Sequence, residues 1–220
     1  MAGMITGLEA EAVRAATERV RAEIAEAAGR AGRDPAEVEL LAAVKYVALE
    51  ELGVIAEAGL TLVGENRAQE LEAKAAAHPD LRWHFIGQLQ SRKVKQILPH
   101  VELIHSVASE SALRQLERHG TPETEILVEV NVAGEEGKAG IAPDELGAFI
   151  GRAPVRVSGL MTMPPFSEDP EDSRRHFAAL RELAEGHGLT RLSMGTSQDF
   201  AVAVEEGATI VRVGSRLYGA

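Results

Sequence analysis

Apolar and polar positions change rhythm at regular intervals along the chain. Short apolar runs such as VELLAAVKYV (38–47) are each followed by a stretch in which apolar residues recur every three or four positions, such as LEELGVIAEAG (49–59). The first pattern predicts a buried β-strand and the second an amphipathic α-helix. Further strands are expected within the ranges 60–66, 81–87, 101–107, 124–132, 155–163, 190–195 and 208–214.

A few residue types mark where the helices should begin and end. Apolar residues at helical spacing from Val13 to Ala27 predict an added helix before the first strand, which we expect Gly29 to end. Asp169 and Pro170 are typical of a helix start. Later helical patterns stop at glycines, which predict their C-termini: Gly59, Gly120, Gly151, Gly188 and Gly207.

The alternation of strand and helix predicts right-handed βαβ units, a parallel sheet and hence an α/β fold. Eight strands with intervening helices are typical of a (β/α)8 TIM-type barrel, which needs at least ~200 residues. A doubly wound open sheet is the main alternative, but the chain has no G-x-G-x-x-G after the first strand and no G-x-x-x-x-G-K-[ST]. We expect one domain spanning residues 1–220, a barrel preceded by the N-terminal helix.

Charge and composition narrow the choice of partners. The chain has 220 residues, a net charge of -11 and no cysteine. Its negative field repels nucleic acid and anionic membranes, so we expect neither as a partner. The start of the chain lacks the apolar core of a signal peptide, and we expect a cytoplasmic monomer. The seven histidines show no metal-ligand spacing, so no metal is expected.

Lys45 interrupts an otherwise apolar run. It shares a strand face with Leu41 and Ala43, while the opposite face is bulkier and suits contact with helices. Lys45 is therefore expected to point into the barrel near its C-terminal mouth, where active sites of this fold gather. Desolvation lowers the pKa of buried lysines in general, and a neutral amine forms Schiff bases with carbonyl compounds. The alternative is a strand-end lysine that reaches solvent or pairs with a carboxylate.

A second cation is predicted to enter the same interior at the end of the chain. Arg212 shares a strand face with Ile210 and is followed by Gly214 and Ser215. The backbone amide of a glycine can approach an anion closely. The loop after the eighth strand is a common phosphate site in these barrels.

The loop after the seventh strand has similar chemistry. Gly195, Thr196 and Ser197 lie between this strand and the next helix, where backbone amides and hydroxyls bind phosphate well. The alternative for Thr196 is plain helix capping, because Thr196 and Asp199 match a capping box. Together with an inward lysine, two adjacent phosphate-compatible loops predict a phosphorylated aldehyde as ligand.

Other polar residues have two interpretations each. Asn66 either contacts the ligand or caps the following helix, and Glu65 either pairs with a cation or acts as a base. His84 is expected to be hydrogen-bonded at the barrel mouth. Met161 either lines the cofactor pocket or packs in the core. The basic run 90–95 is expected to be a solvated helix face, with an anionic partner or a second cofactor as the alternative.

Several of these stretches resemble those of a known family. The motifs are AAVKY, VGENRAQE, WHFIGQLQSRK, IHSV, VEVNVAGEEGKAG, SGLMTM, LSMGTSQDF and VRVGSRLYG. In order and spacing they resemble the pyridoxal-phosphate homeostasis proteins, relatives of the N-terminal barrel of alanine racemase. The resemblance runs from about residue 8 to the end. It implies a barrel that holds pyridoxal 5'-phosphate as an internal aldimine on Lys45.

The resemblance also implies roles for residues around that lysine. Ser197, Gly214 and Ser215 would hold the phosphate group. Arg212 would face the pyridine nitrogen, and Asn66 would lie beside the cofactor. The chain has GTS where many relatives have GMS, and it stops slightly early, but neither departure removes one of these residues.

Two kinds of function follow from this resemblance. The family is described as carriers or regulators of vitamin B6 and amino-acid pools, so we expect no efficient catalysis and no catalytic residue. Pyridoxal-phosphate-dependent apoenzymes are candidate recipients of the cofactor. The alternatives are a pyridoxal-phosphate-dependent amino-acid racemase and a cofactor-free aldolase with a Schiff-base lysine. Alanine racemases use a tyrosine from the partner's second, β-rich domain, and we expect that domain to be absent here because the chain stops at Ala220.

Overall fold

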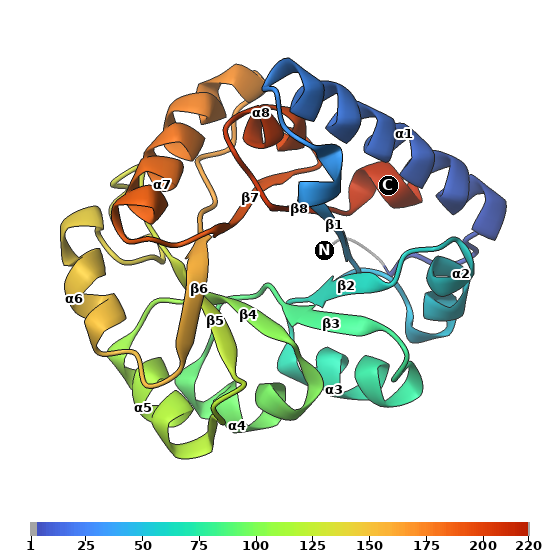
Figure 1. Ribbon diagram of the computed structural model, residues 1–220. Coiled ribbons are helices and arrows are strands. Elements are labelled where there is room, and N and C mark those ends of the chain that lie inside the picture. The colour runs from blue at the N-terminus through green and yellow to red at the C-terminus, as the bar shows by residue number, and fades with distance from the viewer. Residues whose placement is uncertain (1–3, 220) are drawn as a thin grey trace.

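The computed structural model describes residues 4–219, and in it eight parallel strands form a closed barrel with helices around the outside (Figure 1). The strands follow one another around the barrel in chain order, and β8 pairs with β1 to close it. This confirms the expected (β/α)8 architecture. The strands are β1 Glu39–Ala43, β2 Leu62–Glu65, β3 Arg82–Phe85, β4 Leu103–Val107, β5 Glu125–Glu129, β6 Arg156–Met161, β7 Arg191–Thr196 and β8 Ile210–Val213.

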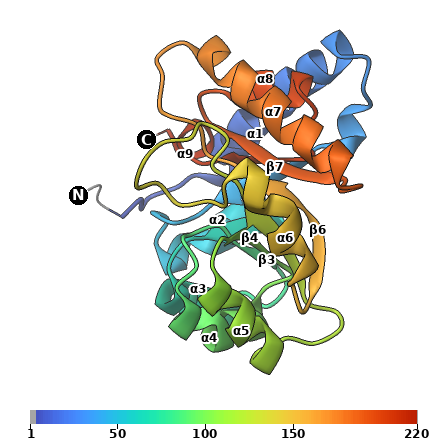
Figure 2. The same ribbon diagram turned by 90° about the vertical axis from the view of Figure 1, so that its left-hand side faces the viewer.

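The helices cover the outer face of the strands. The α-helices are α1 Ala10–Arg30, α2 Leu52–Glu57, α3 Ala68–Ala77, α4 Val94–Ile97, α5 Glu110–His119, α6 Leu146–Gly151, α7 Arg174–Gly186, α8 Phe200–Glu205 and α9 Ser215–Tyr218. In the side view α3, α4 and α5 lie on one side of the barrel and α1, α7 and α8 on the other (Figure 2). The added helix α1 packs across the outside of α8 and α9. Within residues 4–219, no helix combines the length and apolarity needed to traverse a lipid bilayer.

Short 3-10 segments lead into several of the helices. They are η1 Pro35–Glu37, η2 Leu49–Glu51, η3 Ser91–Lys93, η4 Leu98–His100, η5 Pro143–Glu145 and η6 Pro170–Ser173. As expected, Asp169 caps the last of these, because its side chain accepts a hydrogen bond from the backbone N–H of Glu171.

The predicted end of the first helix is wrong by a small margin. Helix α1 runs through Gly29 to Arg30, and Ala31 caps it by donating its N–H to carbonyls of the last turn. The left-handed backbone position falls at Gly32, with φ +67°. A glycine is tolerated inside the last turn, whereas the residue after the cap needs the positive φ that glycine adopts freely.

The first strand is shorter than the apolar run that predicted it. Strand β1 ends at Ala43, and Lys45 lies in a turn closed by a 3.0 Å hydrogen bond from the N–H of Val47 to the carbonyl of Val44. Val44 and Val47 are fully buried although neither belongs to a regular strand. The apolar run continues past the strand because the turn itself packs under the outer helices.

Two apolar clusters account for most of the burial. The larger lies between the strands and the surrounding helices, and the smaller fills the barrel interior. The interior cluster consists of Leu41, Leu62, Leu103, Leu127, Met161 and Ile210. Leu41 and Ile210 therefore face inward, as the strand pattern predicted for the faces that lead to Lys45 and Arg212.

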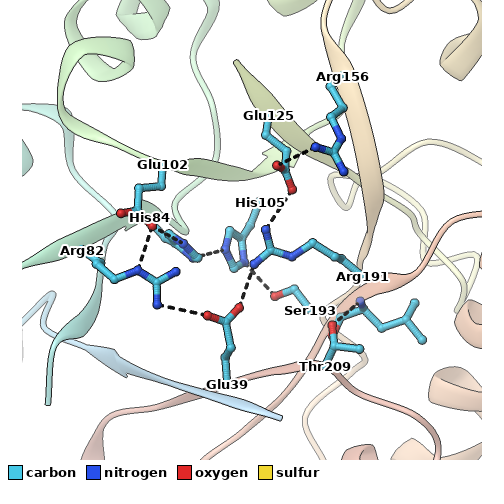
Figure 3. A network of polar contacts seen from close by, with 11 residues as sticks. Glu39, Arg82, His84, Glu102, His105, Glu125, Arg156, Arg191, Ser193 and Thr209 are labelled. Carbon is cyan, nitrogen blue, oxygen red and sulfur yellow. Dashed lines mark hydrogen bonds and ion pairs between the residues drawn. The ribbon is translucent and has the colours of Figure 1, made fainter. Parts of the chain in front are cut away.

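A ring of charged side chains closes the N-terminal end of the barrel (Figure 3). Glu39, Arg82, Glu125 and Arg191 are the first residues of β1, β3, β5 and β7. Glu39 lies 3.2 Å from Arg82 and 2.8 Å from Arg191. Arg191 also reaches Glu125 at 2.8 Å. The sign alternates from one odd-numbered strand to the next, so each carboxylate in the ring contacts a guanidinium.

A buried ion pair joins the loops after β1 and β2. The Lys74 Nζ on α3 lies 2.7 Å from Glu65 Oε2 at the end of β2, and both side chains have an exposed fraction of 0%. Lys74 also donates to the carbonyl of Val44 at 2.8 Å, next to Lys45. The second oxygen of Glu65 accepts from the backbone N–H of Asn66 at 2.6 Å. Glu65 therefore pairs with a cation, one of its two predicted roles.

Loss of Lys74 should destabilise the fold strongly. Lys74→Met would leave the Glu65 carboxylate buried without its cation, which typically costs ~3–5 kcal/mol. Adding Glu65→Gln, which removes the charge but keeps an acceptor for the backbone N–H groups, should restore at least half of the loss. Urea denaturation measures both, with the exposed Lys95→Met as the matched control. A free energy of unfolding for Lys74→Met within ~0.5 kcal/mol of the wild type would contradict the prediction.

Candidate functional site

Lys45 lies at the C-terminal rim of the barrel, two residues beyond the end of β1. Its side chain is half-buried, and its Nζ lies 5.2 Å from the centre of the Tyr46 ring. The expected position at the C-terminal mouth is observed, but Lys45 is only half-buried. The strand pattern ends at Ala43, and the turn leaves Lys45 partly open to solvent. A solute that arrives at this rim can reach the amine.

Arg212 is buried beneath the rim on β8, as predicted. It is 6% exposed and lies opposite Leu41 of β1 and Thr196 of β7 in the strand register. Its Nη2 donates to the carbonyl of Thr162 at 3.0 Å, and its Nη1 donates to Ser193 Oγ. Burial lowers the pKa of Arg212 to about 10, against the opposing influence of Asp199 and of a second acidic residue, Glu129. Arg212 therefore remains a cation at neutral pH.

The two loops predicted to bind phosphate contact each other. The backbone N–H of Gly214, after β8, donates to Ser197 Oγ, after β7, at 3.1 Å. Ser197 is half-buried, and Ser215 is exposed at the start of the short helix α9. The pair of loops thus presents two hydroxyls and backbone amides at one place on the rim, which is donor chemistry that suits an oxyanion.

Gly195 and Thr196 are the last residues of β7 and not part of the loop as expected, and both have structural roles there. Gly195 has φ +88°, and a Cβ there would lie 2.6 Å from the Cβ of Ala203. Only glycine therefore allows β7 to meet α8 this closely. The N–H and hydroxyl of Thr196 donate to Asp199 Oδ1 at 2.7 and 3.1 Å. These bonds tie the end of β7 to Asp199, which is itself the N-cap of α8 and makes no side-chain cap, so the predicted capping by Thr196 is wrong.

Asn66 follows β2, next to the turn that carries Lys45. Its side chain provides no hydrogen-bonded cap for α3, whose N-cap is Arg67, so the capping alternative is wrong. Its Oδ1 is buried without a hydrogen-bond partner. A buried polar atom without a partner is costly, and a bound molecule with a donor group would satisfy it.

Other residues singled out in the sequence lie elsewhere. Met161 is 2% exposed and packs in the interior apolar cluster, as a core methionine does. His84 lies in the barrel interior, 3.0 Å from His105, and not at the mouth as expected. The expected hydrogen bond is present, but the ring extends toward Glu102, which precedes β4 at the N-terminal end of the barrel. The basic run 90–95 forms η3 and the start of α4, with Arg92 and Lys95 exposed.

The barrel brings four strand ends together around one arc of its rim. Because β7, β8, β1 and β2 are consecutive neighbours, Ser197, Ser215, Lys45 and Asn66 follow one another along this arc. Arg212 lies below it. The set supplies an amine that can condense with an aldehyde, hydroxyls and amides for an anion, and a cation for a ring nitrogen. These are the groups that a phosphorylated pyridine aldehyde requires, so the residues present fit that cofactor.

Sequence reasoning missed the polar residues inside the barrel. Ser193 and His105 are fully buried and hydrogen-bonded to each other at 2.7 Å. Their contact joins β7 to β4 across the interior, and such pairs depend on strand register. The available signal was a polar residue on the inward face of an apolar strand, in IHSV and in LSMG.

Comparisons with known proteins agree with the fold. Residues 15–220 match the family model of the alanine racemase N-terminal domain. The pyridoxal phosphate homeostasis proteins of Aquifex aeolicus and Pseudomonas aeruginosa are 44% and 41% identical, over 91% and 92% of this chain and 95% and 93% of theirs. The structure of PipY from Synechococcus elongatus with PLP bound has a TM-score of 0.74 and 34% identity, covering 89% of this chain and all of that one.

The resemblance first visible in the motifs is thereby confirmed over most of the chain. The relatives align along the whole barrel, so the strands that carry Lys45 and Arg212 lie within the matched region. The chain belongs to the family of pyridoxal phosphate homeostasis proteins, whose barrel is that of the alanine racemase N-terminal domain.

Proposed function

We propose that this protein holds pyridoxal 5'-phosphate as a Schiff base on Lys45 and exchanges it within the cell's vitamin B6 and amino-acid pools. The observation that carries the proposal is the arc of the rim on which an accessible amine, two contacting serine-bearing loops and a buried guanidinium occur together. Pyridoxal-phosphate-dependent apoenzymes are the partners that such a carrier implies, and the cytoplasm is where they would meet.

The chemistry is a simple condensation. The Nζ lone pair of Lys45 attacks the aldehyde carbon, and the carbonyl oxygen leaves as one molecule of water as the C=N bond forms. The half-exposed amine supports reversible exchange, because water and other amines can reach the same carbon. The PLP-bound structure of PipY, a relative at 34% identity, supports the same cofactor here.

In this site each remaining residue has a role that follows from its position. Ser197, Gly214 and Ser215 would bind the phosphate, and Arg212 would face the pyridine nitrogen. Asn66 Oδ1, which lacks a partner within the protein, would accept a hydrogen bond from the cofactor. Gly195 would contribute by holding β7 close to α8, and Met161 would pack in the interior below the pyridine ring of the cofactor.

Lys45→Ala should abolish the visible absorbance of the purified protein and leave its stability unchanged. The Lys45 side chain makes no hydrogen bond or ion pair among residues 4–219, and its one polar contact is with the partly exposed Tyr46 ring, so its loss should change stability little. Absorbance before and after borohydride reduction tests this, and mass spectrometry of a tryptic digest identifies the modified lysine. Lys95→Ala, an exposed lysine on α4, is the matched control. Full absorbance in Lys45→Ala, or an adduct on Lys74 or Lys138, would overturn the assignment.

The phosphate loops should distinguish pyridoxal phosphate from pyridoxal. Each hydroxyl that donates to the anion should contribute ~1.5–3 kcal/mol, hence roughly ten- to a hundredfold in affinity. Ser197→Ala and Ser215→Ala should weaken binding of the phosphorylated form by that factor and leave pyridoxal binding as in the wild type. Ser111→Ala on α5 is the control. Equal affinity of the wild type for both compounds in a spectroscopic titration would show that the anion site is misplaced.

The same geometry disfavours efficient racemisation. Racemisation needs two acid/base groups on opposite faces of the substrate's α-carbon, and Lys45 supplies one. The chain has two tyrosines. Tyr46 is 37% exposed and meets Lys45 through its ring, whereas burial raises the pKa of Tyr218 above its usual range. Arg212, a cation that gives up its proton reluctantly, also leaves a bound pyridine ring a weak electron sink.

We therefore expect turnover of L-alanine to D-alanine below ~1 per second, under the range of typical enzymes. The measurement uses protein saturated with pyridoxal phosphate, and follows exchange of the α-proton in deuterated water together with the D-alanine formed. Faster turnover that disappears in Lys45→Ala would replace the carrier with an enzyme.

A further inference from the structure

A chain of buried polar side chains runs through the barrel from its N-terminal ring to Arg212. Arg212 Nη1 donates to Ser193 Oγ, which lies 2.7 Å from His105 Nδ1. His105 Nε2 lies 3.0 Å from His84 Nδ1. The chain ends where His84 Nε2 lies 4.0 Å from a carboxylate oxygen of Glu102 (Figure 3). The proposed cofactor site uses Arg212 and leaves the other members without a function.

Arg212 determines the direction of every hydrogen bond in this chain. A guanidinium only donates, so Ser193 Oγ accepts from it and directs its single hydrogen to His105 Nδ1. His105 then carries its proton on Nε2 and donates it to His84 Nδ1. His84 in turn carries its proton on Nε2, which faces the Glu102 carboxylate.

If the hydrogen bonds of the chain ran in the opposite direction, two groups would be unfavourably placed. Ser193 Oγ would receive two donors, and its own hydrogen would have no acceptor in the chain. The lone pair of His84 Nε2 would then point toward the negatively charged Glu102. The first arrangement gives Ser193 Oγ and both nitrogens of His105 a hydrogen-bond partner, and it directs the His84 Nε2 proton toward the Glu102 carboxylate 4.0 Å away. Buried polar networks with such partners hold one geometry firmly.

Both imidazoles are neutral in this arrangement. Burial lowers the pKa of His84 to about 3, with Arg191 and Arg82 adding to the effect. Burial also lowers the pKa of His105 well below its usual value, and the Arg212 cation adds to it. A protonated His105 would donate from both nitrogens and could no longer accept from Ser193, so charging it would break the chain.

We propose that Ser193 and His105 are positioning residues for Arg212, holding its guanidinium in the orientation in which it meets the pyridine nitrogen of bound pyridoxal phosphate; this rests on the proposed function. Arginine has a long and flexible side chain, with ~2 kcal/mol of rotamer entropy. Here Nη1 is held by Ser193 and Nη2 by the carbonyl of Thr162 at 3.0 Å. Two contacts on β7 and after β6 define the plane of the guanidinium.

The first test does not depend on the cofactor. Nitrogen-15 NMR of histidine-labelled protein without added pyridoxal phosphate should show His84 and His105 neutral, with the proton on Nε2, between about pH 5.5 and 8. Ser193→Ala should change the Nδ1 shift of His105, because the hydroxyl that it accepts from is gone. A proton on Nδ1, or titration of His105 in that range, would overturn the chain.

The second test measures the effect on the cofactor. Ser193→Ala and His105→Leu should raise the dissociation constant of pyridoxal phosphate by roughly tenfold, the effect of one hydrogen bond to a charged group. They should also change the visible circular dichroism, which reports the orientation of the bound ring. Ser193→Thr keeps the hydroxyl and His105→Asn keeps an acceptor near Nδ1, so both should retain wild-type values.

Leu62→Ala provides the control, because it opens a cavity in the same interior and Leu62 pairs in the strand register with Arg82 and not with a member of the chain. It should lower the melting temperature and leave affinity and dichroism unchanged. Unaltered affinity and dichroism in Ser193→Ala, or equal changes in Leu62→Ala, would show that the chain serves only the stability of the fold. A wild-type protein that forms no adduct at Lys45 would defeat the proposed function instead, while the NMR result would still decide whether the chain exists.

Discussion

The pairing of β8 with β1 is the interaction on which the rest of the structure depends. Four register pairs, from Glu39 with Ile210 to Ala42 with Val213, close the sheet on itself. In an open sheet these two strands would be opposite edges with unpaired backbone groups, and Lys45 would lie far from Gly214. Closure satisfies those groups and makes the first and last strands neighbours. The rim site is therefore a product of backbone hydrogen bonding between the two ends of the chain.

A buried ion pair then fixes the conformation of two loops at the rim. Glu65 and Lys74 form a pair in the fully buried layer between β2 and α3, and they hold backbone groups of the turns that carry Lys45 and Asn66. Buried ion pairs contribute little net stability, but they enforce one geometry when their hydrogen bonds are complete. In this protein the enforced geometry is that of two adjacent loops. The turn that carries Lys45 is thereby held in place by a buried, hydrogen-bonded ion pair.

The sequence predicted the barrel well because eight strand and helix patterns in series leave few topologies. The sequence also placed Arg212 correctly. Every second residue of a strand points to the same face, so the cation had to point the same way as its apolar neighbours on that face. The end of β1 was wrong because burial of Val44 and Val47 imitates a strand. Partners across the interior, such as His105 for Ser193, could not be found without the register. The charged ring at the N-terminal end could have been predicted, because four alternate strands begin with residues whose charge alternates in sign.

The charged ring at the N-terminal end limits how a ligand can enter and leave the barrel. The interior above Glu39, Arg82, Glu125 and Arg191 is filled by apolar side chains and the histidine pair. The barrel is therefore closed at its N-terminal end and is not a channel. A ligand at the C-terminal rim can be reached only from that end of the barrel. Under the proposed function, the cofactor would be loaded and handed to a recipient protein through the same face of the barrel.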